Sequence, residues 1–250
     1  MPAVDSLPAL GGVLAGRVIL VTGAAGGLGS ALCKQAALAG AQLILLGRRV
    51  RPLEKLYDEI IASGGSEPAI YPMDLEGATP ADFEAVADSI EREYGRLDGM
   101  VHAAAHFTGL MTHSQVPPEE WLKSIQVNLN APVALTLACL GVLRRSADAS
   151  LLVVLDAPGL VGKAHWGAYG VAKIALRGVV SQWAEELDAS KVRVHGLVPT
   201  PMRTRLRARA YFAENPGLID PPEIVAARCV ELLSAAGRDW RGRIRDLNDE

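Results

Sequence analysis

The chain has 250 residues, of which 50% are hydrophobic and 21% charged, and it carries a formal net charge of −3. This balance supplies a buried core but no basic field, so nucleic acid is not expected as a partner. The three cysteines are odd in number and far apart, which indicates buried thiols in a reducing compartment. No apolar run reaches the roughly 18 residues of a membrane span, and the first residues lack the pattern of a secretory signal. We therefore expect a cytoplasmic protein with no membrane partner.

Short apolar runs alternate with longer segments of helical periodicity. The predicted strands are residues 17–23, 41–47, 68–74, 97–105, 150–156 and 191–199, and the predicted helices are residues 26–40, 51–65, 79–95, 117–145, 166–189 and 221–235. This alternation predicts one α/β domain over residues 1–250, with a doubly wound parallel sheet flanked by helices on both faces. Residues 200–220 are the least regular and most basic part, and we expect a mobile lid with helical pieces there.

The first chemical motif is the segment VTGAAGGLG, which lies between a predicted strand and a predicted helix. Its glycines have the spacing T-G-x-x-x-G-x-G, at Gly23, Gly27 and Gly29. A helix N-terminus offers free N–H donors, and the missing side chains let a pyrophosphate approach the backbone. The alternative is a glycine-rich turn that only packs a strand on a helix. The strand–turn–helix setting favours dinucleotide binding.

The second motif is the end of the second predicted strand, LLGRR. A carboxylate here would bind the adenosine ribose and select NAD(H), but Gly47 is followed by Arg48 and Arg49. Their guanidinium groups suit a 2′-phosphate, which favours NADP(H) over NAD(H). The alternative is two solvated charges at a strand end.

The third motif is the pair Tyr169 and Lys173, one helical turn apart, with Asn128 upstream. A phenol with an ordinary pKa near ~10 is a poor base at neutral pH. An adjacent ammonium favours the tyrosinate, so we expect Lys173 to lower the pKa of Tyr169. The tyrosine would then exchange a proton with an oxygen while hydride moves at the adjacent carbon. Taken alone, Y-x-x-x-K also fits an ordinary amphipathic helix.

Together these motifs resemble, in type and order, the short-chain dehydrogenase/reductase family, from LAGRVILVTG to about WRGRI. The resemblance implies a Rossmann-type fold and hydride transfer between NADP(H) and a small carbonyl or alcohol substrate. It implies Tyr169 as the acid/base, Lys173 as its activator and ribose ligand, and Asn128 as the holder of a relay water. The implied cofactor site comprises Gly23, Ala25, Gly27, Leu28, Gly29, Arg48, Arg49, Asp74, Ala104, Tyr169, Lys173, Pro199 and Thr204. It also implies a homodimer or homotetramer, for which the long apolar helices 117–145 and 166–189 would supply the interface.

Three departures from the family pattern stand out. The family's N-N-A-G element is His102-Ala103-Ala104-Ala105 here, so the carboxamide geometry is lost. The proline–glycine turn is Pro199-Thr200, without the conformational freedom of glycine. The family's serine, thirteen residues before the tyrosine, is Asp156.

Asp156 leaves several alternatives open, because an ionised carboxylate cannot donate a hydrogen bond to a carbonyl and repels an oxyanion. In the first alternative, Asp156 is protonated and donates a hydrogen bond to the substrate oxygen as serine does. In the second, Asp156 serves a C=N substrate that becomes cationic, as in pteridine reductases, which carry an aspartate at this position. In the third, the protein is a non-catalytic NADP(H)-binding sensor or scaffold. A further alternative is that Asp156 braces the turn DAPG and points away from the site.

Two other groups of residues lie outside these motifs. His102, His106 and His113 lack the partners and spacing of a metal site, so no metal is expected, and His106 is expected to face the substrate pocket. Arg203, Arg205, Arg207 and Arg209 fit a solvated face or, alternatively, the recruitment of an anionic substrate.

Overall fold

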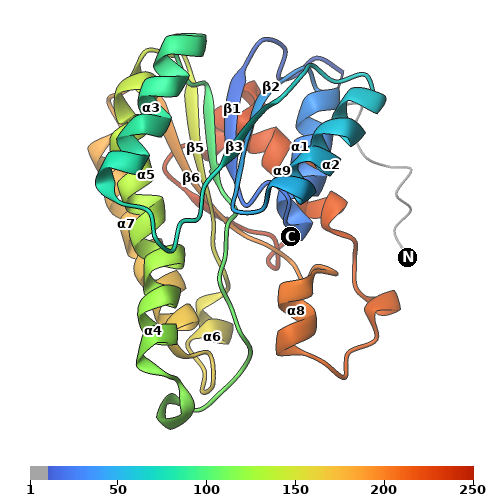
Figure 1. Ribbon diagram of the computed structural model, residues 1–250, viewed down its shortest axis with the longest axis vertical. Coiled ribbons are helices and arrows are strands. Elements are labelled where there is room, and N and C mark those ends of the chain that lie inside the picture. The colour runs from blue at the N-terminus through green and yellow to red at the C-terminus, as the bar shows by residue number, and fades with distance from the viewer. Residues whose placement is uncertain (1–10) are drawn as a thin grey trace.

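The computed structural model of the protein describes residues 11–250, so residues 1–10 of the expected domain lie outside the described part. In the described chain, seven strands form one parallel sheet in the order β3-β2-β1-β4-β5-β6-β7 (Figure 1). The strands are β1 (Val18–Thr22), β2 (Gln42–Gly47), β3 (Ala69–Pro72), β4 (Gly99–His102), β5 (Ala149–Val154), β6 (Val192–Val198) and β7 (Ile244–Asp246). Because β1 pairs with both β2 and β4, the strand order reverses beside β1, where such sheets bind their ligands.

Helices cover both faces of the sheet. They are α1 (Gly27–Leu38), α2 (Val50–Ala62), α3 (Pro80–Tyr94), α4 (Pro118–Ile125), α5 (Ala131–Arg144), α6 (Pro158–Val161), α7 (Gly167–Glu186), α8 (Arg205–Ala210) and α9 (Pro222–Leu233). α1, α2 and α9 lie on one face, and α3, α5 and α7 lie on the other (Figure 1). The central strands are buried along their whole length, which explains their continuous apolar runs. The predicted fold class, a doubly wound Rossmann-type sheet, is confirmed.

All six predicted strands and all six predicted helices are present, with ends that differ by a few residues. The largest difference is in β4, which ends at His102 rather than at residue 105 because the chain leaves the sheet there. The sequence did not predict β7, whose three residues IRD carry two charges and no apolar run. It also did not predict the short helix α6, whereas α8 lies in the segment 200–220, where helical pieces were expected. With α4, these two short helices extend beyond the carboxyl ends of the strands (Figure 1).

The predicted helix 117–145 runs without a break from Pro118 to Arg144 and contains a π-helical turn at Gln126–Asn130. In the described chain it is the one helix long and apolar enough to cross a membrane. Its inner face packs with α3 against the sheet, which is the environment of a core helix. The π-turn places Asn128 on that buried side, and such turns are frequent at functional sites.

Candidate active site

The glycine loop between β1 and α1 is shaped by close backbone packing. Gly23 has a φ of +66°, and a Cβ atom built on it would lie 2.7 Å from the Cα atom of Ala104. A Cβ atom on Gly29 would overlap with the carbonyl oxygen of Gly23. In this part of the structure no side chain caps the N-terminus of α1, so its first N–H groups have no side-chain acceptor. The loop therefore has the shape and the positive dipole end that suit a pyrophosphate.

The other predicted residues of this region pack into the core or fix the end of β4. The side chain of Leu28 lies in the core at 7% exposure, and Ala25 packs against the same core cluster. The N–H groups of Ala103 and Ala104 both donate to Thr22 Oγ1 at 3.2 Å, which fixes the end of β4 against β1. The loop and the segment after β4 thus form one rigid edge.

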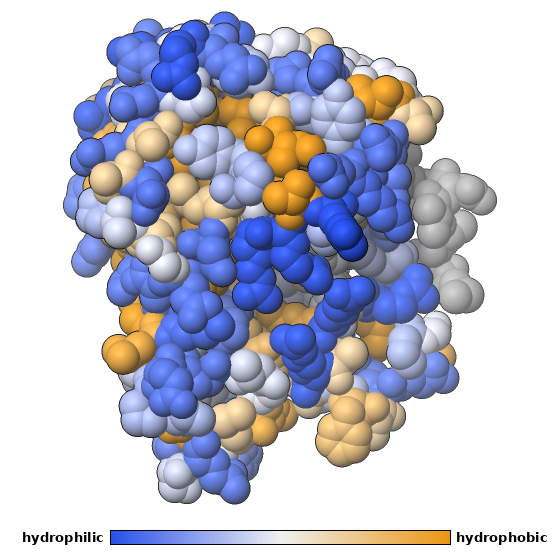
Figure 2. Space-filling view, in the orientation of Figure 1, coloured by the Kyte–Doolittle hydropathy of each residue, from blue (hydrophilic) through white to orange (hydrophobic). Residues whose placement is uncertain are grey.

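Arg48, Arg49 and Asp74 lie at the carboxyl edge of the sheet. Arg48 and Arg49 follow β2, Asp74 follows β3, and all three side chains are exposed. Asp74 Oδ1 accepts a hydrogen bond from the N–H of Glu76 at 3.2 Å. Figure 2 shows hydrophilic residues gathered across the centre of this face of the molecule. The two arginines are therefore accessible to an anionic ligand at the end of β2.

Tyr169 and Lys173 meet Asp156 in the interior. Tyr169 and Lys173 lie on α7 and are 4% and 5% exposed, and Asp156 follows β5. The hydroxyl group of Tyr169 donates a hydrogen bond to Asp156 Oδ2. The ammonium group of Lys173 donates to the carbonyl oxygen of Val154 at 2.8 Å. The alternative that Asp156 points away from the site is therefore wrong.

The electrostatics differ from the expectation for Tyr169. Burial and the neighbouring carboxylate of Asp156 raise the pKa of Tyr169 well above its ordinary value. Burial lowers the pKa of Lys173, although the charge of Asp156 opposes this shift. Burial raises the pKa of Asp156, against the opposing effects of Lys173 and of the Tyr169 hydrogen bond. The expectation that Lys173 leaves Tyr169 with a lowered pKa is wrong here, because burial of the phenol and then the adjacent Asp156 carboxylate both raise the pKa.

Asn128 holds the backbone of His106 through its carboxamide. Its Oδ1 accepts from the His106 N–H at 2.9 Å, and its Nδ2 donates to the His106 carbonyl oxygen at 2.8 Å. Nδ2 also lies within hydrogen-bond distance of the carbonyl oxygen and the hydroxyl group of Ser124. The side chain is 1% exposed and its amide is engaged by these partners, so it positions the loop after β4.

Two cavities adjoin the Tyr169–Asp156 pair. One is lined by Asp156 together with residues 199–202 and α8. The other is lined by Tyr169 and by Glu120 and Ser124 of α4. Trp166 lines both cavities. Its ring stacks on that of Phe107 with centroids 5.3 Å apart, and Tyr169 contacts both rings. An aromatic wall therefore separates the two cavities.

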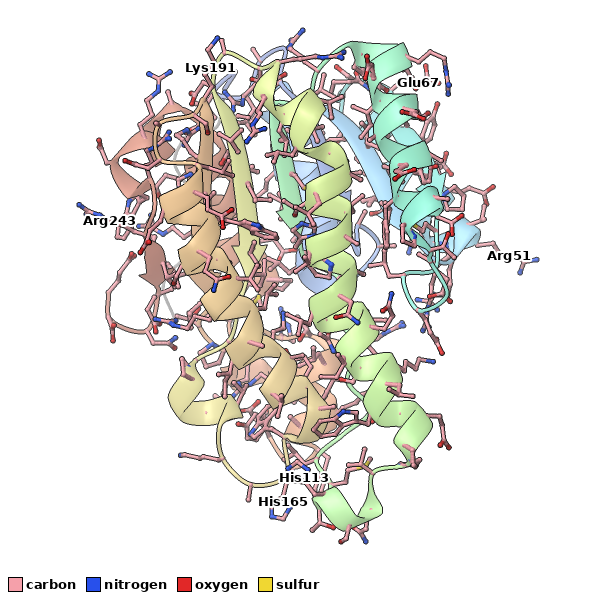
Figure 3. The ribbon with its side chains drawn as sticks, turned by 90° about the vertical axis from the view of Figure 1, so that its left-hand side faces the viewer. Arg51, Glu67, His113, His165, Lys191 and Arg243 are labelled. Atoms are coloured by element: carbon pink, nitrogen blue, oxygen red, sulfur yellow. The ribbon has the colours of Figure 1, made fainter. Side chains whose placement is uncertain are left out.

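His102, at the end of β4, and His106, in the loop after it, have separate partners. His106 Nε2 is hydrogen-bonded to Glu120 Oε1 at 2.5 Å, so the predicted pocket-facing side chain turns to α4 instead. His102 Nε2 is hydrogen-bonded to Thr136 Oγ1 at 2.8 Å, and burial lowers the pKa of His102 to about 3. His113 and His165 lie at the far end of the same layer (Figure 3). Within residues 11–250, no three His, Cys, Asp or Glu side chains are grouped as for a metal ion.

The segment 200–220 packs against the site. Thr204 caps α8 by accepting from the N–H of Arg207 at 3.3 Å. A Cβ atom built on Gly27 would lie 2.8 Å from Thr204 Cγ2, so this segment touches the glycine loop. The carbonyl oxygen of Pro199 accepts from Asn248 Nδ2 at 3.3 Å. The side chain of Asn248 thus braces the turn that lacks its glycine.

Two of the four arginines in this segment have partners. Arg207 forms two hydrogen bonds with Glu214, at 2.5 and 2.6 Å, and lies 4.6 Å from the centroid of the Tyr211 ring. Arg209 donates to the Phe107 carbonyl oxygen at 2.8 Å and so ties α8 to the loop after β4. Arg203 and Arg205 are exposed and fit the expected solvated face, whereas Arg207 is only partly exposed and does not fit it.

From the sequence, we expect residues 106–116, 157–168 and 200–220 to build the substrate pocket, and Phe107 and Trp166 of these segments do line the two cavities. Sequence reasoning missed Glu120 and Asn248, which line the cavities from outside the motifs and outside these segments. The one signal for Glu120 is its position two helical turns before Asn128. Asn248 has no comparable signal, because it reaches the site only through the fold.

The comparisons with known proteins agree with this geometry. The family model for short chain dehydrogenases matches residues 17–214. The protein named Uncharacterized oxidoreductase YciK, from Escherichia coli (strain K12), is 35% identical over 230 residues, which cover 92% of this chain and 91% of the relative.

Two solved structures show the same fold. A short chain dehydrogenase from Shigella flexneri 2a complexed with NADP has a TM-score of 0.90 and 32% identity, and the match covers 94% of this chain and 98% of that one. A short chain dehydrogenase from Escherichia coli CFT073 complexed with NADPH has a TM-score of 0.90 and 33% identity, with coverage of 94% and 98%. This chain belongs to the short-chain dehydrogenase/reductase family of oxidoreductases.

Proposed function

We propose that the protein is an NADP(H)-dependent oxidoreductase that moves hydride between the nicotinamide and a small carbonyl or alcohol substrate. The observation that carries the proposal is the meeting of Tyr169, Lys173 and Asp156 at the carboxyl ends of the strands. The cavity beside Asp156 is also lined by Thr204, which touches the glycine loop. A dinucleotide on that loop would therefore reach the cavity that Asp156 lines, next to the hydrogen bond between Asp156 and Tyr169.

The residues around the loop fit the cofactor. Gly23, Gly27 and Gly29 leave no room for side chains where a pyrophosphate would approach, and Arg48 is exposed where a 2′-phosphate would lie. Two relatives of the same fold were solved with NADP and NADPH bound. When bound, the nicotinamide supplies or accepts the hydride.

The residues of the chain handle the proton and the orientation of the substrate. Tyr169 is the hydroxyl group that faces the substrate oxygen, and its raised pKa keeps it protonated and able to donate at neutral pH. The ammonium group of Lys173 donates one hydrogen bond to the Val154 carbonyl oxygen. Its remaining N–H donors suit the hydroxyl groups of a ribose. The rings of Phe107 and Trp166 keep water from the reacting oxygen.

A second candidate reaction is the reduction of a C=N group. It is favoured by the hydrogen bond that Asp156 accepts from Tyr169, since a carboxylate at this place attracts a nitrogen that becomes cationic. The third candidate, a cofactor-binding scaffold without turnover, is disfavoured by the intact Tyr169–Lys173 pair.

We also propose a homodimer or homotetramer formed through α5 and α7. Leu137 on α5 and Val171 and Ile174 on α7 are 58%, 44% and 45% exposed. Figure 3 shows these two helices side by side toward the viewer. Large apolar side chains on adjacent helices are typical of a covered surface. The segment 200–220 would act as the substrate lid, and the buried cysteines suit the cytoplasm.

The direct test is a titration followed by a turnover screen. NADPH and NADH are titrated by fluorescence, and aldehydes, ketones, quinones and cyclic imines are then screened for loss of the reduced-nicotinamide absorbance. The proposal expects tighter binding of NADPH and turnover of at least one carbonyl. Turnover of imines alone would support the second candidate, and tight binding without any turnover would support the scaffold.

A further inference from the structure

The hydrogen bond between Tyr169 and Asp156 has a direction. The Tyr169 hydroxyl carries one proton, and that proton is donated to Asp156 Oδ2. The phenol oxygen is left with its lone pairs as acceptors toward the cavity. A substrate hydroxyl that meets this oxygen must therefore donate to it. The three groups then form one chain, from substrate O–H to Tyr169 and from Tyr169 to Asp156.

The charges around the pair are already balanced without a tyrosinate. The ammonium group of Lys173 is buried, donates to Val154 and lies 5.8 Å from the centroid of the Tyr169 ring. Asp156 provides the negative charge that offsets it. Ionising Tyr169 would add a second anion in hydrogen-bond contact with the first, which costs free energy in a buried site. Tyr169 therefore does not serve as the resting base.

We propose that Asp156 is the terminal acceptor and donor of the proton and that Tyr169 relays it to and from the substrate oxygen. This inference rests on the proposed function and specifies how its acid/base site works. It differs from a Tyr–Lys mechanism in which the phenol itself stores the charge.

The step balances in both directions. In oxidation the O–H proton of the alcohol moves to Tyr169 Oη while the Tyr169 proton moves to Asp156 Oδ2. The carbinol hydrogen leaves as hydride, with both electrons, to the oxidised nicotinamide, and the C=O bond forms. In reduction the protonated Asp156 returns its proton through Tyr169 to the oxygen that the incoming hydride has made basic. Tyr169 is neutral before and after each step.

Several charged groups surround the pair and set its pH dependence. Lys173 faces it from α7, and His102 on β4 is buried and neutral, with a pKa of about 3. Arg207 on α8 lines the Asp156 cavity but is paired with Glu214. Glu120 and His165 line the Tyr169 cavity, and Glu120 is engaged by His106. Burial raises the pKa of Asp156, which brings this carboxyl group closer to neutrality than a solvated one.

The first experiment needs neither cofactor nor substrate. The ionisation of Tyr169 is followed by ultraviolet difference absorbance of tyrosinate in wild type and in Asp156→Asn, with Tyr169→Phe in each background as the blank. If the Asp156 carboxylate accepts the hydrogen bond of the Tyr169 hydroxyl, the apparent pKa of Tyr169 falls by at least about one pH unit in Asp156→Asn, because the neighbouring negative charge is removed. An unchanged Tyr169 titration would overturn the proposal.

The second experiment measures the relay in turnover. Oxidation of cyclohexanol and 2-butanol by NADP⁺ is followed across pH in wild type, Asp156→Asn and Asp156→Ser. The proposal expects wild-type kcat/KM to rise with a carboxyl-type pKa and to be level above neutrality. Asp156→Asn should lose about 100-fold or more in kcat, and its remaining rate should rise into the alkaline range. NADPH affinity should stay within about twofold, since Asp156 is not a ligand of the pyrophosphate or the 2′-phosphate.

The outcomes separate this inference from the proposed function. An Asp156→Asn variant with wild-type kcat and an unchanged pH profile would overturn the relay while leaving the oxidoreductase intact. If neither alcohol nor any carbonyl is turned over by wild type, the proposed function fails, and the tyrosinate titration still decides where the proton lies.

Discussion

The carboxamide of Asn128 brackets the backbone of His106. Its oxygen accepts from the His106 N–H at 2.9 Å, and its nitrogen donates to the His106 carbonyl oxygen at 2.8 Å. These bonds join the π-turn of the long helix to the loop after β4, which carries Phe107 into the aromatic wall. One buried side chain therefore couples the core of the helical layer to the shape of the substrate site.

Replacing Asn128 with alanine should loosen this loop. The change leaves two backbone groups of His106 without their partners, so we expect a loss of about 1–3 kcal/mol in the free energy of unfolding and a lower kcat. Urea denaturation and NADPH turnover measure the two effects. Asn130→Ala is the control, because Asn130 is exposed and bonds only to Gln126 in its own helix. Equal effects of the two variants would contradict the bracketing role.

Arg48 should decide between the two nicotinamide cofactors. If its guanidinium group binds the 2′-phosphate, Arg48→Ala should weaken NADPH binding about 10- to 100-fold and leave NADH binding nearly unchanged. Fluorescence titration of both cofactors gives the two dissociation constants. Arg243→Ala is the matched control, since Arg243 is also exposed but lies at the amino end of β7 (Figure 3). An Arg48→Ala variant with unchanged preference would remove the basis for NADP(H) selection.

His102 should make the folded state sensitive to mild acid. Its pKa is about 3 in the folded chain against 6.5 for a free histidine, so the unfolded chain binds the extra proton first. Stability is therefore complete above about pH 6.5 and falls as the pH drops toward 3, by at most about 1.4 kcal/mol per pH unit.

The denaturant concentration at the midpoint of unfolding is measured at several pH values between about 7.5 and about 5. His102→Asn, which restores the carboxamide of the family pattern, should show a smaller loss over this interval. The pKa of the buried His195 is also lowered, to about 4. Both proteins therefore still lose some stability as the pH falls. His113→Asn, at an exposed position, should follow wild type. Identical slopes for wild type and His102→Asn would refute this assignment.

The exposed apolar side chains of α7 should hold the assembly together. Ile174→Glu places a charge on the proposed interface and should shift the protein to a smaller species. Light scattering coupled to gel filtration measures the mass. Leu38→Glu is the control, because Leu38 is 56% exposed on α1, on the other face of the sheet. If both variants keep the wild-type mass, the interface lies elsewhere.

The sequence predicted the sheet and its helices because each buried strand is an unbroken apolar run and each helix has its own period. It placed Tyr169, Lys173 and Asp156 together because fixed spacings on β5 and α7 bring them to one edge of the sheet. It did not predict β7, which has three residues and two charges. Its short length leaves no period to recognise.

Two site properties depended on contacts that no spacing encodes. The pKa of Tyr169 was expected to fall, but burial of the phenol and the neighbouring Asp156 carboxylate raise it instead. His106 was expected to face the pocket, but Glu120 binds its ring from α4. In both cases the side-chain partner is set by the loop after β4 and the turn after β5, whose conformations follow from packing rather than from local sequence.

The measurement that tests the account most directly is turnover by Tyr169→Phe with cofactor binding as its control. NADPH affinity is determined by fluorescence, and carbonyl reduction by loss of the reduced-nicotinamide absorbance, on wild type and variant side by side. The account predicts a wild type that reduces at least one carbonyl and a variant that binds NADPH within about twofold but loses about 100-fold or more in kcat. A Tyr169→Phe variant that keeps wild-type turnover, or a wild type that binds NADPH and reduces nothing, would contradict it.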